Sequence, residues 1–203
     1  MALTMVHLLC ADRWAQTHPI YRDSPEYYLG AISPDAIHVR DHDDKSHKNA
    51  IHLNNWNEMH PGDIADYWRA RSSPFDIGYG VHCLTDCQWV AGCRRTFPGL
   101  FGADGKLCVE RYYNDTFVTD FALRDAEPRL REILLLIGKA DVPADHPLLT
   151  FDEFYKWREM ILAAYAGECP RQGEARFIDE TYVRAFCESA MALIDQVYEE
   201  AMS

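Results

Sequence analysis

The sequence predicts an all-α fold, a helical bundle in one domain covering residues 1–203, and three observations point to it. Apolar residues recur every three to four positions through most of the chain, which is the spacing of one face of an α-helix. No stretch alternates apolar and polar β-branched residues as a half-buried strand does. The hydrophobic content of 48%, with 12% aromatic residues, is enough for a sizeable core in a chain of 203 residues.

Net charge, cysteine spacing and hydropathy limit which binding partners and which cellular compartment are expected. A formal net charge of -12 argues against binding to a nucleic-acid backbone, which depends on lysine and arginine. The seven cysteines show no repeated CxxC spacing, which favours reduced thiols, and Cys10, Cys83 and Cys87 are expected as small core residues. No apolar run approaches the ~20 residues of a membrane span, and the N-terminus lacks a secretion signal. The expected location is therefore cytoplasmic.

The first predicted helix spans residues 5–15. Its stripe at helical spacing consists of His7, Ala11, Trp14 and His18. Residues 18–48 then combine His-Pro and Ser-Pro pairs with a charged stretch, and such residues are typical of turns. The sequence predicts a long irregular loop here, followed by a short helix at residues 61–70.

Residues 73–92 predict a buried helix with a well-marked start. Ser73 is a suitable N-cap, Pro74 occupies the first helical position and Asp76 the third. Within this helix His82 and Asp86 are four residues apart and therefore project from one face. Such a pair can bind a metal ion, although HxxxD also occurs as two ordinary hydrogen-bonded neighbours.

The remaining segments complete the predicted bundle. Residues 97–107 are rich in glycine and are expected to form a flexible connection that can act as a lid. Helices are predicted at residues 108–123, 127–137 and 178–201. Thr150 and Glu153 form a capping box that begins a further amphipathic helix.

A second group of potential ligands lies upstream of the HxxxD helix. Residues 30–53 hold Asp35, His38, His42, His47 and His52. Imidazole and carboxylate are side chains that bind zinc well. Together with His82 and Asp86, this group favours a metal site over an isolated hydrogen-bonded pair.

Four segments resemble a known family: YYLGAISPDAIHVR, SHKNAIHL, FDIGYGVHCLTDCQW and YYNDTFVTDFAL. In this order and spacing they are similar to the bacterial zinc-dependent phospholipase C family, a distant relative of the secreted phospholipases C and single-strand nucleases. The similarity continues through PLLTFDEFYKWRE to the last helix and covers most of the chain. It implies a helical bundle of the phospholipase C and nuclease type, in which up to three zinc ions activate a water for attack on a phosphodiester.

The resemblance also implies a set of ligands. Carried over by motif, the metal ligands are His7, Asp35, His52, His82 and Asp86. The HxxxE pair of the phospholipases has no literal match, and Asp115 or Asp120 can stand in for it. The secreted members also use the amine of a processed N-terminal tryptophan and carry another histidine after HxxxD. This chain begins with Met1 and has Trp89 after HxxxD, so one or two ions are expected instead of three.

The expected reaction is hydrolysis of a phosphoester by metal-activated water. Zinc is the expected ion, although another divalent transition metal would suit the same ligands. Asp35 is assigned either a bridging position between two ions or the role of general base. His38 can join the site, contact the phosphate or only stabilise its turn. Arg40 and His47 are further candidates for substrate contact, with an ordinary solvated loop as the alternative.

Two other functions stay open at this point. The dipeptide His42-Asp43 is also found in helical metal phosphohydrolases of the HD type, although here it lies in a polar stretch. A metal-binding module without hydrolytic activity is the other alternative, because an incomplete ligand set can bind an ion without catalysis. The expected partner is a small phosphorylated molecule, and the sequence leaves the oligomeric state open.

Overall fold

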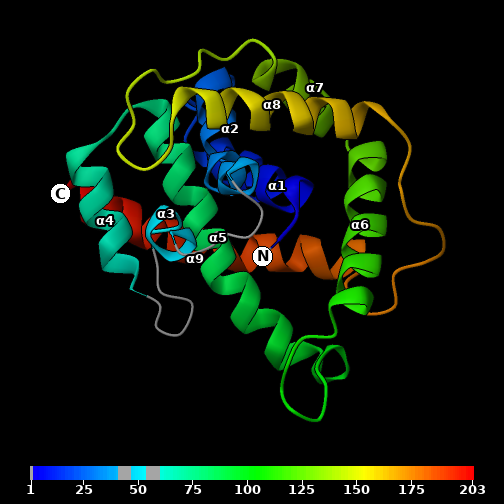
Figure 1. Cartoon of the computed structure of the whole chain (residues 1–203). Coiled ribbons are helices and arrows are strands. Elements are labelled where there is room, and N and C mark those ends of the chain that lie inside the picture. Colours follow the sequence, from blue (N-terminus) through cyan, green and yellow to red (C-terminus); the bar gives the residue numbers. More distant parts are fainter. Residues whose placement is uncertain (1, 41–46, 54–59) are drawn as a thin grey trace.

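The computed structural model describes residues 2–40, 47–53 and 60–203, and within them the all-α prediction is confirmed. The first part of the chain forms α1 (Thr4–Thr17), α2 (Pro25–Gly30), the 3₁₀ helix η1 (Ser33–Val39), α3 (Lys48–Ile51), α4 (Pro61–Ala70) and α5 (Pro74–Thr96). The second part forms η2 (Pro98–Leu100), α6 (Val109–Ala126), α7 (Pro128–Ile137), α8 (Phe151–Ala166) and α9 (Glu180–Met202) (Figure 1). None of the described helices has the length and apolarity needed to cross a bilayer.

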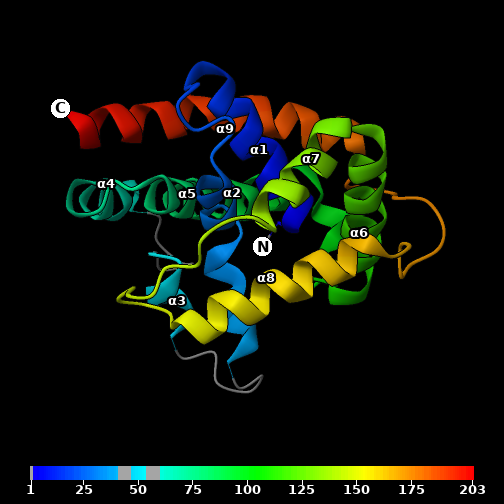
Figure 2. The same cartoon turned by 90° about the horizontal axis from the view of Figure 1, so that it is seen from above.

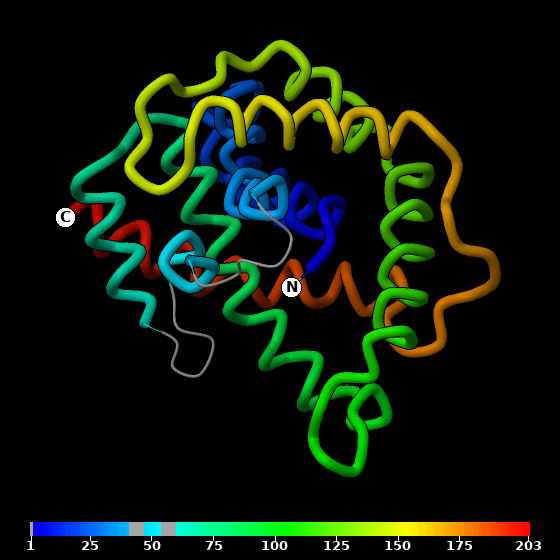
Figure 3. Tube along the Cα trace, viewed as in Figure 1, coloured from blue at the N-terminus to red at the C-terminus, as the bar shows by residue number. Residues whose placement is uncertain are grey.

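Helix α1 lies at the centre of the arrangement. It contacts α5, α6, α7 and α9, so its side chains are almost all buried. Seen from above, α5 runs between α9 on one side and α8 on the other (Figure 2). The tube in Figure 3 shows α6 standing across the end of the molecule opposite α4. The beginning of α1 therefore lies inside the bundle, and its polar residues must find partners there.

Local capping residues explain where the helices begin. The Ser73 hydroxyl accepts the backbone N–H of Asp76 at 3.2 Å, and Pro74 follows it at the first helical position. Thr150 and Glu153 make both hydrogen bonds of the predicted capping box. These two predicted helix starts are confirmed.

The end of the HxxxD helix differs from the prediction. Helix α5 continues to Thr96, four residues beyond Gly92. A Cβ atom at Gly92 would lie 3.1 Å from the hydroxyl oxygen of Tyr182. The glycine therefore allows close packing of α9 on α5 and does not end the helix.

The predicted irregular loop at residues 18–48 is wrong in its middle part, because α2 and η1 lie there. Ser24 caps α2 by accepting the backbone N–H of Tyr27 at 3.3 Å, with Pro25 in the first turn. The same serine and proline pairs that occur in turns thus start two short helices. Residues 41–46, the charged part of that stretch, lie outside the described residues.

Residues 97–107, predicted as a flexible connection that can act as a lid, contain η2 and a hydrogen-bonded turn. The backbone N–H of Gly102 donates to Lys106 O at 2.7 Å, Phe101 and Leu107 make an antiparallel bridge, and Leu100 is fully buried. Gly105 has φ of +73°, a value that favours glycine. The segment is a hydrogen-bonded turn packed on the end of α5.

Candidate metal centre

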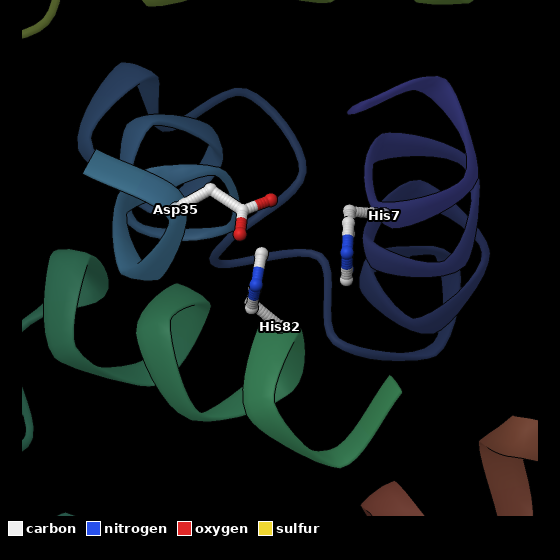
Figure 4. A group of neighbouring side chains, drawn as sticks. All are labelled: His7, Asp35 and His82. Atoms are coloured by element: carbon white, nitrogen blue, oxygen red, sulfur yellow. The ribbon is translucent and has the colours of Figure 1, made fainter. Parts of the chain in front are cut away.

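Helices from distant parts of the chain bring a group of histidines and aspartates together. His7 comes from α1, Asp35 from η1, His52 from the end of α3, and both His82 and Asp86 from α5. Figure 4 shows His7, Asp35 and His82 projecting into the same space between their helices. All five side chains are buried, Asp35 being the most accessible at 8%. We call these five residues the donor cluster.

Close contact between α2 and α5 sets the position of His82. A Cβ atom at Gly30 would overlap the carbonyl oxygen of Phe75, and one at Gly78 would overlap that of Tyr27. The two backbones can therefore approach closely only with glycine at both places. This contact brings Ala31, the residue after α2, against the imidazole of His82.

Backbone carbonyls select the tautomer of two imidazoles. His82 Nδ1 lies 2.8 Å from Ala31 O, and His52 Nδ1 lies 3.0 Å from Lys48 O. Since a carbonyl only accepts, Nδ1 carries the proton in a neutral ring and Nε2 keeps its lone pair. Histidines that bind metals are usually oriented in this way.

The distances between donor atoms fit the spacing of ligands around one ion. His52 Nε2 lies 3.4 Å from Asp35 Oδ1, and His82 Nε2 lies 3.7 Å from Asp86 Oδ2. Charge-assisted hydrogen bonds are shorter, about 2.7–2.9 Å. Two ligands at ~2.1 Å from a tetrahedral zinc ion are separated by about 3.4 Å, so the observed spacing resembles the edges of a coordination shell.

Several polar atoms of the donor cluster are buried without a hydrogen bond among the described residues. They are His7 Nδ1, His7 Nε2, Asp35 Oδ1, His82 Nε2 and Asp86 Oδ2. Leaving one buried polar atom unsatisfied costs about 1–3 kcal/mol, so several of them at one place require a compensating interaction. Metal ions would satisfy the carboxylate oxygens and one lone pair of each imidazole, whereas the N–H of a neutral His7 ring needs an acceptor instead.

The electrostatics hold the donors in the forms that bind metal. Burial, and then the neighbouring His7, lower the pKa of His82 to about 3, so its ring is neutral at pH 7. Burial alone would raise the pKa of Asp86, but the interaction with His7 outweighs it and holds the pKa well below its usual range. The nearby imidazoles of His52 and His82 likewise outweigh burial and lower the pKa of Asp35. Both carboxylates are ionised.

The geometry also bears on the number of ions. Two overlapping groups have their donor atoms within 4.8 Å of one another: His7 with Asp35 and His82, and His52 with His82 and Asp86. His82 Nε2 has a single lone pair and can serve one ion. The rings of His7 and His82 stack at 3.7 Å with 9° between their planes, so their in-plane lone pairs run parallel and do not meet at a point. This stacking favours His7 and His82 as ligands of different ions.

Asp115 and Asp120 lie at different places. Asp115 Oδ2 accepts the backbone N–H groups of Arg176, Phe177 and Ile178 at 3.1, 2.6 and 3.3 Å, so it anchors the segment before α9 and lies outside the donor cluster. Asp120 is fully buried, and its Oδ2 accepts the N–H of Met5 at 3.0 Å and the hydroxyl of Tyr165.

Asp120 nonetheless interacts electrostatically with His7 of the donor cluster. Its Oδ1 has no hydrogen bond among the described residues, and it interacts with the charge of His7. Burial raises the pKa of Asp120 to about 6. Of the two aspartates expected to stand in for the missing HxxxE pair, Asp120 is therefore the one that lies near a cluster residue.

The predicted substrate contacts His38, Arg40 and His47 lie in three different surroundings. His38 lies beside Asp35, with Nε2 3.8 Å from Oδ1, and its side chain is 32% exposed. Arg40 instead donates to both carboxylate oxygens of Glu153, at 2.5 and 3.1 Å, and so ties the end of η1 to the start of α8. His47 is exposed where α3 begins. His42 and Asp43, on which the HD alternative rests, lie outside the described residues.

Sequence reasoning missed Tyr113 as a neighbour of the site. Burial and the negative charge of Asp35 raise the pKa of its hydroxyl, yet its side chain is partly exposed. Tyr113 thus interacts electrostatically with Asp35 while its side chain stays accessible to solvent. Its position within the quoted YYNDTFVTDFAL segment was the available signal, but the neighbouring tyrosine, Tyr112, is buried and hydrogen-bonded to Trp89.

The comparisons with known proteins add no family. No protein-family model, no curated protein and no solved structure matches this chain significantly. The arguments below therefore come from the donor cluster and its surroundings.

Proposed function

We propose that this protein is a metal-dependent hydrolase of phosphoesters, with zinc as the preferred ion. The observation that carries the proposal is the buried convergence of imidazole nitrogens and carboxylate oxygens at 3.4 to 3.7 Å from one another. Several of these atoms have no hydrogen bond among the described residues. A mixed nitrogen and oxygen donor set of this kind suits zinc and related divalent transition metals.

The chain's own residues have distinct tasks in this proposal. His52, His82 and Asp86 hold the ion, because their donor atoms form one compact group. The carbonyls of Ala31 and Lys48 fix the imidazoles of His82 and His52 before the ion arrives. When bound, zinc lowers the pKa of a coordinated water toward neutrality and polarises a phosphoryl oxygen.

Asp35 and its neighbours face the accessible side. Asp35 is ionised and can accept a proton from water, or share an ion with Asp86. His38 lies beside it, Tyr113 interacts with its charge, and both carry hydrogen-bond donors that suit the oxygens of a phosphate. Preference for a phosphoester rests further on the four segments that resemble the phospholipase C family. A small phosphorylated molecule is the proposed substrate class.

A second candidate function is a purely structural metal site. It is favoured by the burial of all five donor residues, since structural zinc sites are closed and fully ligated whereas catalytic ones keep a position open. In that case the ions held by the two overlapping ligand groups would join α1, η1, α3 and α5 without turnover.

One experiment separates the two candidates. Zinc-loaded protein is assayed on bis-p-nitrophenyl phosphate, p-nitrophenylphosphorylcholine and p-nitrophenyl phosphate, beside the double variant His82→Ala, Asp86→Ala. A matched control changes the exposed pair His60→Ala, Asp63→Ala at the start of α4. If the protein is a hydrolase, the wild type and the control turn over substrate and the cluster variant does not. Stoichiometric zinc without turnover on any ester would support the structural role. Equal turnover in all three proteins would exclude the proposal that the donor cluster catalyses hydrolysis.

A further inference from the structure

Two cysteines far apart in sequence meet in the core. Cys10 on α1 and Cys187 on α9 have their Sγ atoms 2.6 Å apart, and they are 177 positions apart in the chain. Other thiol contacts are much longer: Cys169 Sγ lies 3.7 Å from Phe117 O, and the Tyr182 hydroxyl lies 3.8 Å from Cys93 Sγ. The Cys10–Cys187 separation exceeds a covalent S–S bond of about 2.05 Å by about half an ångström.

The surroundings of this pair hold the two sulfurs in place. Helices α1 and α9 pack along one another, and both cysteines are buried, at 0% and 1% exposure. The neighbours Leu9, Ala11 and Ala190 belong to the same core. No large backbone movement is therefore needed to join the sulfurs.

We propose that Cys10 and Cys187 are the site of an oxidative modification, an intramolecular disulfide that links α1 to α9. The oxidant is a small disulfide such as oxidised glutathione. The thiolate of one cysteine attacks it, forming a mixed disulfide and releasing one reduced thiol. The second cysteine then attacks the protein sulfur of the mixed disulfide and releases the other. Together the two cysteines lose two electrons. The small disulfide gains these electrons and is released as two reduced thiols.

The timing of the step follows from burial. In the folded protein, burial and the adjacent Cys187 raise the pKa of Cys10 well above its usual value, so little thiolate is present. The first attack therefore takes place while the chain is unfolded or α1 and α9 are apart. Docking of the two helices then brings the second sulfur into range, and burial protects the finished bond from reductants.

The link would also act on the donor cluster, and this consequence is independent of any hydrolytic activity. Cys10 follows His7 by about one turn of α1, so a covalent bond to α9 holds the helix that carries this imidazole. Closing a segment of this length removes entropy from the unfolded chain, and we expect a higher melting temperature by roughly 10 °C.

The test counts thiols in the whole chain. Protein refolded in oxidised or in reduced glutathione is denatured, titrated for free thiols, and mapped by peptide mass spectrometry without reductant. The chain has seven cysteines, and we expect all seven to be free after reducing refolding and five after oxidising refolding, with a peptide pair joining Cys10 to Cys187. Cys187→Ala should keep six free thiols in both buffers, and Cys108→Ala should fall from six to four.

Each other outcome contradicts the proposal. Seven free thiols in protein refolded under oxidising conditions, with helical circular dichroism intact, would overturn it. A map joining other cysteines would overturn it as well. If Cys187→Ala does not fold, the wild-type thiol count and peptide map still decide.

Discussion

The imidazole of His82 lies 2.8 Å from the carbonyl of Ala31 through its Nδ1, and this contact depends on two glycines whose missing side chains let the helices approach. Gly30 and Gly78 let α2 and α5 approach until their backbones meet. The orientation of a candidate metal ligand is therefore controlled by helix packing.

Gly78→Ala should disturb the donor cluster from outside. The added methyl group would overlap the carbonyl oxygen of Tyr27, so α2 must move and Ala31 moves with it. We expect a loss of about 1–3 kcal/mol in the free energy of unfolding and zinc affinity at least 10-fold weaker. Denaturant titration and competition with a chromophoric chelator measure the two effects.

Gly62→Ala is the matched control for that change. Among the described residues, no atom outside the local backbone of α4 lies within 4 Å of a Cβ built at Gly62, so we expect unchanged zinc affinity and slightly higher stability. Wild-type zinc affinity in a folded Gly78→Ala protein would show that this packing does not position His82.

Removal of the ion should lower the melting temperature. An ion that binds only the folded chain stabilises it by about 2.7 kcal/mol when its concentration is 100 times the dissociation constant. For a chain of this length we expect the melting temperature to fall by roughly 5–10 °C after chelation and dialysis. Scanning calorimetry with and without zinc measures it. The double variant His82→Ala, Asp86→Ala should show no such difference, and an equal shift in both proteins would place the ion elsewhere.

Asp115 should prove structural. Replacing it with alanine removes the acceptor of the backbone N–H groups at residues 176–178, and we expect a loss of about 2–3 kcal/mol in the free energy of unfolding. The metal content should stay at the wild-type value, whereas Asp35→Ala should lower it. Elemental analysis of the two purified variants compares them directly, and metal loss from Asp115→Ala would return this residue to the ligand set.

His146 should make the fold sensitive to acid. Burial, and then the charge of Arg71, lower its pKa to about 4, against ~6.5 in an unfolded chain. The neutral ring lies 3.0 Å from the Tyr67 hydroxyl, which in turn donates to Asp76 at 2.8 Å. Because the unfolded chain takes up the proton first, this contribution to stability is complete above about pH 6.5 and is lost as the pH falls toward 4.

Urea unfolding at pH 7.5 and pH 5 measures that loss. The wild-type midpoint should fall more between the two pH values than the midpoint of His146→Gln, which keeps hydrogen-bonding groups but does not titrate. The chelated protein is used, so that ion release does not contribute. Identical pH dependence in the two proteins would assign the acid sensitivity to other groups.

Much of the helical architecture could be predicted from local signals. Ser73-Pro74 and the Thr150–Glu153 capping box fixed two helix starts, because these residues act on the backbone next to them. The short helices α2 and η1 could not be separated from a loop, since Ser-Pro pairs occur in both. Whether such a segment forms a helix or an irregular loop depends on its packing, of α2 on α5 and of η1 mainly on α8, and a local pattern does not contain that information.

The candidate site was predicted in part for a similar reason. Residue type and motif spacing singled out His82 and Asp86, and the structure places them beside His52. The same approach left Asp115 and Asp120 equivalent, because both are aspartates on one helix. Their difference comes from the distant segments that reach them, Arg176 to Ile178 for Asp115 and the start of α1 for Asp120. Arg40 was likewise predicted as a substrate contact, because the sequence does not show that its guanidinium pairs with Glu153.

All five donor residues belong to the stretch from His7 to Asp86, and helices α6 to α9 supply none of them. Ions bound at the two overlapping ligand groups would together cross-link α1, η1, α3 and α5. Fraying of any one of these elements would then release an ion and loosen the others. Amide protons in all four should consequently exchange with solvent in a concerted manner, and zinc should slow them together.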